Sequence, residues 1–253
     1  MAQNVIRVPR GCPTVQKAID LAVIFSERKE YTEKDPLKIR LEEGDHKIVG
    51  QYGRMKVTCS HITFVGSGKD QTTIRGGFKV INQQHVKFEE LTITNQSGFG
   101  LFFGSETNVD VLKCAVKECG RTGMSVYDGA TVTATQCEFM ENGSNGVDCY
   151  DANTKARLND CTMHHNGEDG LGAGGHAVVD LHGTKTNIHS NKSYGIYAGS
   201  RTKINIHLPS QHNTSHGNVG GDRFQVAGGS IANINADGTF THVGVDDDDD
   251  GDY

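Results

Sequence analysis

Short runs in which apolar and polar residues alternate recur about every 23 residues through the middle of the chain. Four stretches align in one register, and they begin at Val86, Val109, Val132 and Ala156. Successive side chains of a strand point to opposite faces, so each run predicts a short strand with one buried face. Three runs per repeat, separated by turns, predict a triangular solenoid whose equivalent residues stack at a spacing of about 4.8 Å.

Five columns of equivalent residues define the repeat. They are Leu91, Cys114, Cys137 and Cys161; Ile93, Val116, Phe139 and Met163; Gln96, Cys119, Asn142 and Asn166; Gly100, Gly123, Gly146 and Gly170; and Leu101, Met124, Val147 and Leu171. A fifth repeat places Ile188, Asn191, Gly195 and Ile196 at these stations, and a degenerate sixth repeat places Asn213 and Gly217. The third column predicts an asparagine ladder that passes amide hydrogen bonds between coils. The glycine column predicts corners with unusual backbone angles.

The first part of the chain predicts the entry to such a solenoid. Thr14 is a good N-cap, and the next apolar residues follow at helical spacing, at Val15, Ala18, Ile19 and Ala22. An amphipathic helix over about residues 14–25 would close the open end of the core. A charged surface loop runs from Phe25 to Pro36, and strands are predicted at residues 37–41, 56–59, 62–66, 73–75 and 78–80.

These patterns predict an all-β fold, a single right-handed parallel β-helix of about eight coils with an N-terminal capping helix. The period could also indicate a leucine-rich repeat, but that class needs a dense leucine pattern that this chain lacks. One domain is predicted over residues 1–242. Residues 243–253 are predicted to be a disordered acidic tail, solvated or attached to a cation or a basic partner.

Charge and cysteine content narrow the classes of function. The net charge is −6, and the last eight residues hold six Asp and no Lys or Arg, so the body is neutral (−6 + 6 = 0). A neutral body disfavours a nucleic-acid partner. The start of the chain has no apolar signal segment, and no apolar run reaches the length of a membrane span. The seven cysteines form no CxxC pair, so we expect core thiols and a cytoplasmic, reducing setting.

Several segments carry a resemblance to known proteins. TVQKAIDLA at 14–22, KIRLEEGDHKI at 38–48, HITFVGSGKDQTTIRGG at 61–77 and VKFEELTITN at 86–95 resemble the opening of pectin-lyase-like right-handed β-helices. The later coils resemble the β-helix repeats of F-box-associated adaptors, which present substrates to ubiquitin ligases. The resemblance spans about residues 5–220. It implies the fold but leaves the function open, because this fold carries lyases, hydrolases, epimerases and binding modules.

We therefore keep two hypotheses of function. The first is a non-enzymatic recognition module that binds a protein or a glycan on its flat faces. Phe102, Tyr127 and Tyr150 are the candidate ligand-binding residues, with Tyr127 and Tyr150 one repeat apart. Their alternative interpretation is stacking between coils, which stabilises the solenoid. The chain would be a monomer or an end-to-end dimer, with residues 222–245 covering the last coil or forming the contact.

The second hypothesis is a carbohydrate-active enzyme, a polysaccharide lyase, hydrolase or epimerase, with a divergent acidic site. Asp128, Asp148 and Asp151 are the candidate catalytic residues, and Asp128 and Asp151 lie one repeat apart. Pectinesterases, which the chain resembles, use two Asp on neighbouring coils with Arg and Gln nearby. The register supplies no cation here, so one would have to come from Arg121 or Arg201. The alternative is that these Asp are solvated turn residues.

Histidine is the remaining candidate chemistry. Eight of the twelve His lie between residues 164 and 216, and the register stacks His164 under His189. With Glu141, this pair is the candidate site for a transition metal, while Ca²⁺ would suit the acidic site. The alternatives are an exposed polar column or a surface for a partner. No resident cofactor is predicted by any motif.

Overall fold

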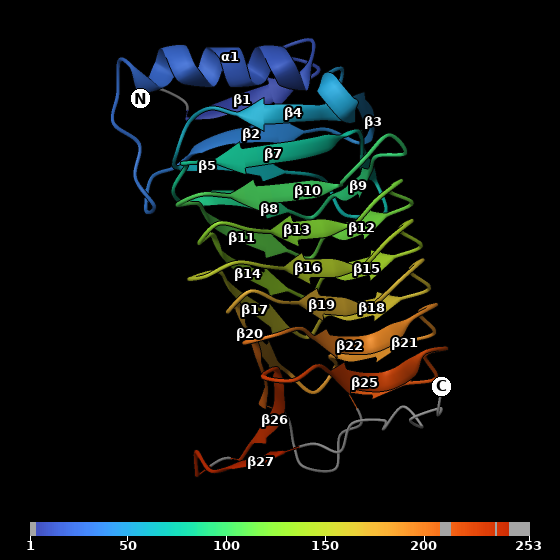
Figure 1. Ribbon diagram of the computed structural model, residues 1–253. Coiled ribbons are helices and arrows are strands. Elements are labelled where there is room, and N and C mark those ends of the chain that lie inside the picture. Colours follow the sequence, from blue (N-terminus) through green and yellow to red (C-terminus); the bar gives the residue numbers. More distant parts are fainter. Residues whose placement is uncertain (1–3, 208–213, 236, 243–253) are drawn as a thin grey trace.

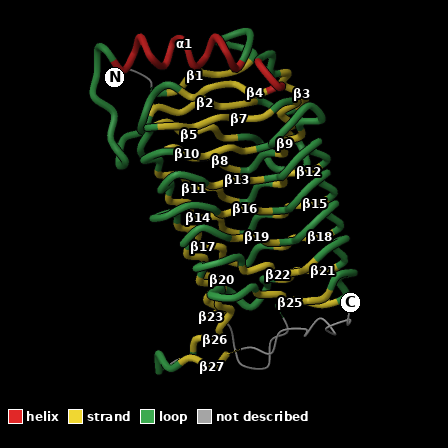
Figure 2. The backbone as a smooth tube through the Cα atoms, in the orientation of Figure 1, coloured by secondary structure: helices red, strands yellow, loops and turns green. Residues whose placement is uncertain are grey.

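The chain winds into a parallel β-solenoid with three sheets, which confirms the predicted architecture (Figure 1). The computed structural model describes residues 4–207, 214–235 and 237–242. The predicted acidic tail at residues 243–253 lies outside this part. Figure 2 shows the strands aligned in columns along the solenoid, with loops between them. Two of the sheets have eight strands each, in agreement with the predicted eight coils.

Sheet A has eleven strands and holds the first strand of most coils. They are β1 (Val5–Val8), β2 (Leu37–Leu41), β5 (Ile62–Val65), β8 (Val86–Glu89), β11 (Asn108–Leu112), β14 (Thr131–Thr135), β17 (Lys155–Asn159), β20 (Val178–His182), β23 (Lys203–His207), β26 (Ser230–Ile234) and β27 (Phe240–His242). All pair in parallel except β27, which runs antiparallel to β26. The pairing with β27 covers the free edge of β26. Both strands lie within residues 222–245, the segment that we expected to cover the last coil or to form a dimer contact.

The other two sheets follow within each coil. Sheet B contains β3 (Gly44–Lys47), β6 (Thr72–Arg75), β9 (Thr92–Thr94), β12 (Ala115–Lys117), β15 (Glu138–Met140), β18 (Thr162–His164), β21 (Asn187–His189) and β24 (Ser215–His216). Sheet C contains β4 (Arg54–Val57), β7 (Gly77–Ile81), β10 (Leu101–Gly104), β13 (Met124–Val126), β16 (Val147–Cys149), β19 (Leu171–Ala173), β22 (Tyr194–Ala198) and β25 (Gly221–Gln225). The strand predicted at residues 56–59 lies two residues earlier, as β4. The sequence pattern did not predict β1 and β3.

Helix α1 (Val15–Ser26) covers the N-terminal end, as predicted, and a 3₁₀ turn follows later at Gln51–Gly53. The Thr14 hydroxyl accepts a hydrogen bond of 3.2 Å from the Lys17 amide, which makes Thr14 the N-cap. The predicted apolar stripe is the buried face of the helix, at Val15, Ala18, Ile19 and Ala22. Within the described ranges, no helix is long and apolar enough to cross a bilayer.

The core columns hold the predicted register. Val116 pairs with Ile93 and Phe139, and Met124 pairs with Leu101 and Val147. The predicted cysteine column is fully buried, and all seven cysteines of the chain are free. Burial alone raises the pKa of Cys59 to about 11, and burial dominates the rise of the Cys119 pKa to about 12. These thiols act as small apolar core residues.

The asparagine ladder exists, but one of its predicted members, Gln96, is wrong. Gln96 is exposed, and the buried Asn95 takes its place in the column. The backbone carbonyl of Asn95 accepts a hydrogen bond from the Gly120 amide, and in the next coil the carbonyl of Cys119 accepts the equivalent bond from the Gly143 amide. Asn95 is therefore the equivalent of Cys119. Compared with the next coil, the segment from Ile93 to Asn95 is one residue shorter and the turn from Asn95 to Leu101 is one residue longer, so Leu101 keeps its register with Met124. At the other end Asn218 accepts from Asn191, and the predicted Asn213 lies outside the described residues.

The glycine column has a different cause from the one predicted. Its members do not adopt the left-handed conformation, which is found instead at the station directly before the asparagine column, occupied by Glu118, Glu141, His165 and Ser190. A Cβ on Gly146 would lie 2.8 Å from the amide nitrogen of Asn166. The column is therefore glycine because the asparagine ladder occupies the space that a side chain would need.

Candidate functional site

The outer face of sheet C changes character along the solenoid. Its central outward row is Lys56, Lys79, Phe102, Ser125, Asp148, Gly172, Tyr197 and Phe224. The row is basic near the N-terminus, aromatic and acidic in the middle, and aromatic again near the C-terminus. Equivalent residues of successive coils stack in a parallel sheet, so a one-dimensional pattern in the sequence becomes a continuous strip.

Phe102, Tyr127 and Tyr150 lie together, and we call these three residues the aromatic line. The rings of Phe102 and Tyr127 are 5.9 Å apart and those of Tyr127 and Tyr150 are 5.7 Å apart, both nearly parallel. The rings stack between coils, as the structural alternative predicted, and all three side chains are half-buried. Burial raises the pKa of both tyrosines, and the carboxylate of Asp148 adds to this shift.

Basic side chains lie against the N-terminal end of the aromatic line. The Arg54 guanidinium is 5.2 Å from the Phe102 ring centre, and the Lys79 ammonium is 5.7 Å from it. Arg121, one of the two cations considered for the acidic site, lies 5.0 Å over the Phe99 ring. Arg121 is thus close to the aromatic line, and its charge also lowers the pKa of Tyr127. Arg201 lies elsewhere, with its guanidinium 3.5 Å from His176.

Asp148 is buried in the middle of the face, next to the end of the aromatic line. Its carboxylate accepts a hydrogen bond of 2.8 Å from the Thr122 hydroxyl and another from the Asn145 side chain. Burial raises the pKa of Asp148, and these two donors partly offset that rise. Its row neighbour Ser125 is fully buried, with no hydrogen bond for its hydroxyl within the described residues.

A second buried carboxyl, Asp169, lies beside Asp148 and was not among the predicted residues. The Asp169 amide donates to the Asn145 side-chain oxygen at 2.8 Å, so Asn145 bridges the two acids. Burial raises the pKa of Asp169, while a hydrogen bond from the Ser193 side chain and one from the Tyr194 amide lower it. The signal for Asp169 was present in the sequence: Thr122, Asn145 and Asp169 are the polar residues that directly precede three glycines of the glycine column.

Gly172 lies beneath these groups, which leave no room for a side chain there. A Cβ at this position would lie 2.9 Å from the Asn145 amide nitrogen, 3.2 Å from Asp148 Oδ1 and 3.6 Å from the Tyr150 hydroxyl. Three polar groups therefore converge over a residue without a side chain. We call the group formed by Asp148, Asp169, Asn145 and Gly172 the acidic nook.

The other two predicted catalytic residues lie outside the acidic nook. Asp128 and Asp151 are exposed at the turn that follows sheet C, and they line one shallow depression together with Ser105. The Ser105 hydroxyl is 3.5 Å from Asp128. The structure thus brings Asp128 and Asp151 to one place and Asp148 to another, and only Asp148 is buried.

The predicted histidine pair is formed, on sheet B. The rings of His164 and His189 stack at 5.0 Å, and His189 stacks on His216 at 5.3 Å, so the column continues with His216. His164 contacts Glu138 at 3.2 Å, while the Glu141 side chain is exposed. The carboxylate nearest His164 is therefore that of Glu138, because residue 141 occupies a left-handed corner beyond the strand.

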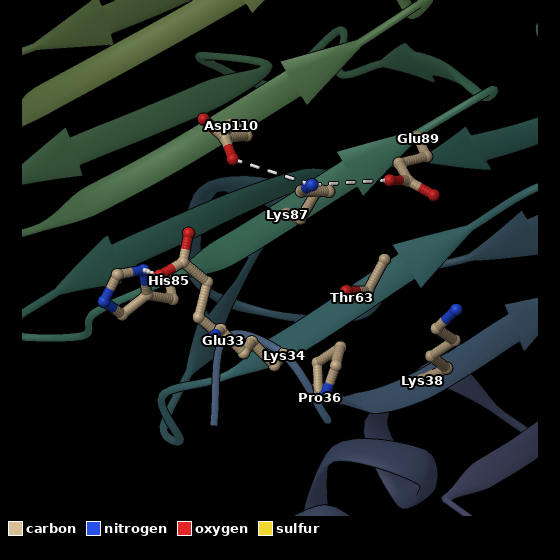
Figure 3. Close-up of a pocket in the computed structure, with 9 residues that line it drawn as sticks. All are labelled: Glu33, Lys34, Pro36, Lys38, Thr63, His85, Lys87, Glu89 and Asp110. Atoms are coloured by element: carbon tan, nitrogen blue, oxygen red, sulfur yellow. Dashed lines mark ion pairs between the residues drawn. The ribbon is translucent and has the colours of Figure 1, made fainter. Parts of the chain in front are cut away.

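A separate cleft of about 250 Å³ lies between the loop after α1 and the outer face of sheet A (Figure 3). Lys87 lies at its centre, 3.7 Å from both Glu89 and Asp110, and Glu33 of the loop contacts His85 at 3.7 Å. These opposite charges neutralise one another, so the cleft has no excess charge with which to select a ligand.

Comparison with known proteins places the fold in a family. Residues 47–218 match the family model described as right handed beta helix region. No curated protein matches the sequence. Among solved structures, the chain is similar to the Agl-KA catalytic domain, with 16% identity and a TM-score of 0.62 over 92% of this chain and 47% of that one.

It is also similar to ORF18 of Geobacillus virus E2, with 12% identity and a TM-score of 0.54 over 91% of this chain and 61% of that one. A pectin methyl esterase of rice weevil is similar as well, with 10% identity and a TM-score of 0.50 over 90% of this chain and 88% of that one. The chain thus spans about half of the first of these structures and less than two thirds of the second. Identities this low show the fold alone. The family match covers more than half of the sequence, which confirms the predicted handedness: the chain belongs to the right-handed β-helix region family.

Proposed function

We propose that the outer face of sheet C binds an extended glycan chain. The observation that carries this proposal is the aromatic line ending at the acidic nook, with ring edges, tyrosine hydroxyls and a buried carboxylate in one strip. Aromatic rings supply apolar area for sugar C–H groups, and the hydroxyls and carboxylate supply hydrogen bonds for sugar hydroxyls. The similarity to the rice weevil pectin methyl esterase motivates the choice of a glycan as ligand.

Polysaccharide cleavage is the second candidate function, and the pair Asp148 and Asp169 favours it. Two carboxyls in a buried site with raised pKa values suit general acid–base work, because one can stay protonated when the other is ionised. In this hypothesis Asp148 is the acid, since its Oδ1 converges with the Asn145 amide and the Tyr150 hydroxyl over Gly172. Asp128 and Asp151 remain candidates for contact with the substrate at the neighbouring turn.

A glycan-array screen of the purified protein tests the binding proposal. The variant Tyr127→Ala/Tyr150→Ala should lose binding by about tenfold or more, since stacked aromatic contacts each contribute about 0.5–1.5 kcal/mol. His165→Ala, an exposed ring on sheet B, is the matched control and should bind normally. Absence of glycan binding by the wild type, or equal binding by both variants, contradicts the proposal.

Incubation of the glycans that bind with wild type and Asp148→Asn separates a binding module from an enzyme. New reducing ends or unsaturated products with wild type, abolished in Asp148→Asn, would establish cleavage. Binding without turnover would support the recognition module. If no glycan binds, a protein partner is the next candidate, as the resemblance to F-box-associated adaptors predicts.

We also propose a cytoplasmic location and a solution state of monomer or end-to-end dimer. The support for the location is the set of seven free, buried thiols, which a reducing compartment preserves. The support for a dimer is that a solenoid ends in strands with one unpaired edge. Measurement of molar mass by light scattering tests the oligomeric state.

A further inference from the structure

A group of three possible metal ligands lies on sheet A, away from the acidic nook and the histidine column. Asp180 and His182 face outward from β20, and His207 faces outward from the neighbouring strand β23. One ligand atom from each of the three lies within 4.8 Å of the other two. The register explains the grouping: His182 pairs with His207, and Asp180 is two residues earlier on the same face of β20.

The contacts within the group match the spacing of atoms around a metal ion. His207 Nε2 lies 2.9 Å from Asp180 Oδ1, and the two imidazole rings stack at 4.2 Å. Two ligand atoms on one tetrahedral zinc ion lie about 3.3 Å apart, given bonds of about 2.0–2.1 Å. An ion can therefore replace the proton between His207 and Asp180 with a small change of distance. One ring must turn about its Cβ–Cγ bond so that both nitrogens point to the ion.

The surroundings favour this use of the three side chains. All three are half-buried, which limits competition from water. The Asn205 side chain donates to Asp180 Oδ1 at 2.9 Å and fixes the orientation of that carboxylate. Arg157 is the row neighbour of Asp180, and its side chain donates to Asn159 at 3.3 Å.

We propose that Asp180, His182 and His207 bind a divalent transition-metal ion such as Zn²⁺. Two imidazoles and one carboxylate suit borderline ions and not Mg²⁺ or Ca²⁺, which prefer oxygen ligands. Three protein ligands leave a position for water or a ligand atom of another molecule. This site lies on sheet A and is independent of the proposed glycan face on sheet C.

Titration of the untagged full chain with Zn²⁺ by calorimetry, with Mg²⁺ as the comparison ion, tests the proposal. One equivalent of Zn²⁺ should bind, and His182→Ala or His207→Ala should abolish saturable binding. Asn205→Ala, which removes only the support of Asp180, should weaken binding by about tenfold. His85→Ala, in the cleft beside Glu33 and outside every candidate metal site, is the matched control and should bind as the wild type does.

Arg157→Ala gives a readout that damage to the fold cannot imitate. Removal of this nearby positive charge should tighten Zn²⁺ binding, and added salt should reduce the difference between variant and wild type. Unchanged binding in His182→Ala/His207→Ala, loss of binding in His85→Ala, or no saturable binding by the wild type would overturn the proposal. Circular dichroism of each variant shows whether it is folded.

Discussion

Asp148 shows how one side chain can face outward on a strand and still be buried. Thr122 and Asn145 reach over it from the preceding turns, and Tyr150 lies beside it. A carboxylate in such a position is costly unless its lone pairs are satisfied, and two donors meet that need. The same burial that raises its pKa makes it suitable as a proton donor.

We expect Asp148→Asn to be at least as stable as the wild type at pH 7. The pKa of Asp148 in the folded protein is raised above 3.8, so the folded state holds the proton more tightly. Its contribution to stability is therefore complete at low pH and is lost as the pH rises through the folded pKa. Asparagine removes the charge, keeps an acceptor for Asn145 and can donate to the Thr122 hydroxyl.

Asp148→Ala is the comparison, because it leaves the Thr122 and Asn145 donors without an acceptor. It should lower the free energy of unfolding by about 1–3 kcal/mol. Urea unfolding of both variants at pH 4 and pH 7 measures the difference. Equal destabilisation by both substitutions at pH 7 would contradict this account of the site.

At the scale of elements, the asparagine ladder holds the turns between sheets B and C in register. Asn166 donates to Asn191 Oδ1 at 2.9 Å and to the Phe139 carbonyl at 3.1 Å. Its own Oδ1 accepts from the amide and the side chain of Asn142. Each ladder asparagine therefore satisfies backbone groups that the turn leaves without a partner.

Asn166→Ala should lower the free energy of unfolding by about 3 kcal/mol or more, since several buried groups lose partners at about 1–3 kcal/mol each. Gln96→Ala is the matched control, because Gln96 is an exposed polar residue of a neighbouring turn and not a ladder member. We expect it to change stability by less than about 0.5 kcal/mol. Similar losses in both variants, measured by urea unfolding, would contradict the assignment of the ladder.

The histidine column predicts a dependence of stability on pH. Burial, together with the charges of His164 and His216, lowers the pKa of His189 below 6.5. The unfolded chain then binds the proton first, so stability present above pH 6.5 is lost as the pH falls toward the folded pKa. The difference in unfolding free energy between wild type and His189→Gln should change between pH 7.5 and 5. If the difference in unfolding free energy stays constant over this pH range, the pKa of His189 is not lowered by folding.

At the scale of the whole molecule, each coil contacts only its neighbours, so stability should vary along the solenoid axis. Helix α1 covers the N-terminal coil, whereas in the described part of the chain the C-terminal coil has β27 on sheet A only. We expect amide hydrogens of β14 and β17 to exchange slowest and those of β25 and β26 to exchange faster. Hydrogen exchange followed by mass spectrometry measures this order, and equal protection of β25 and β14 would contradict it.

The sequence determined the solenoid because stacking repeats the same environment in every coil. A residue that packs inward at one coil packs inward at the next, so the columns through Val116, Phe139 and Met163 could be read directly. The N-cap at Thr14 and the buried stripe of α1 follow from equally local rules. The sequence pattern did not reveal the shift from Gln96 to Asn95, because one residue fewer before Asn95 and one more after it leave the period of 23 residues unchanged.

Tertiary structure decided which outward residues form a site. The sequence could name Asp148, but not that Thr122 and Asn145 bury it or that Asp169 lies beside it, because turn lengths control how side chains fold over the strand. Likewise, the pairing of β20 with β23 brings Asp180, His182 and His207 together across 25 to 27 residues of chain, on either side of the fifth repeat. Period and alternation fix what faces inward, whereas contacts on the outer faces depend on the geometry of each turn.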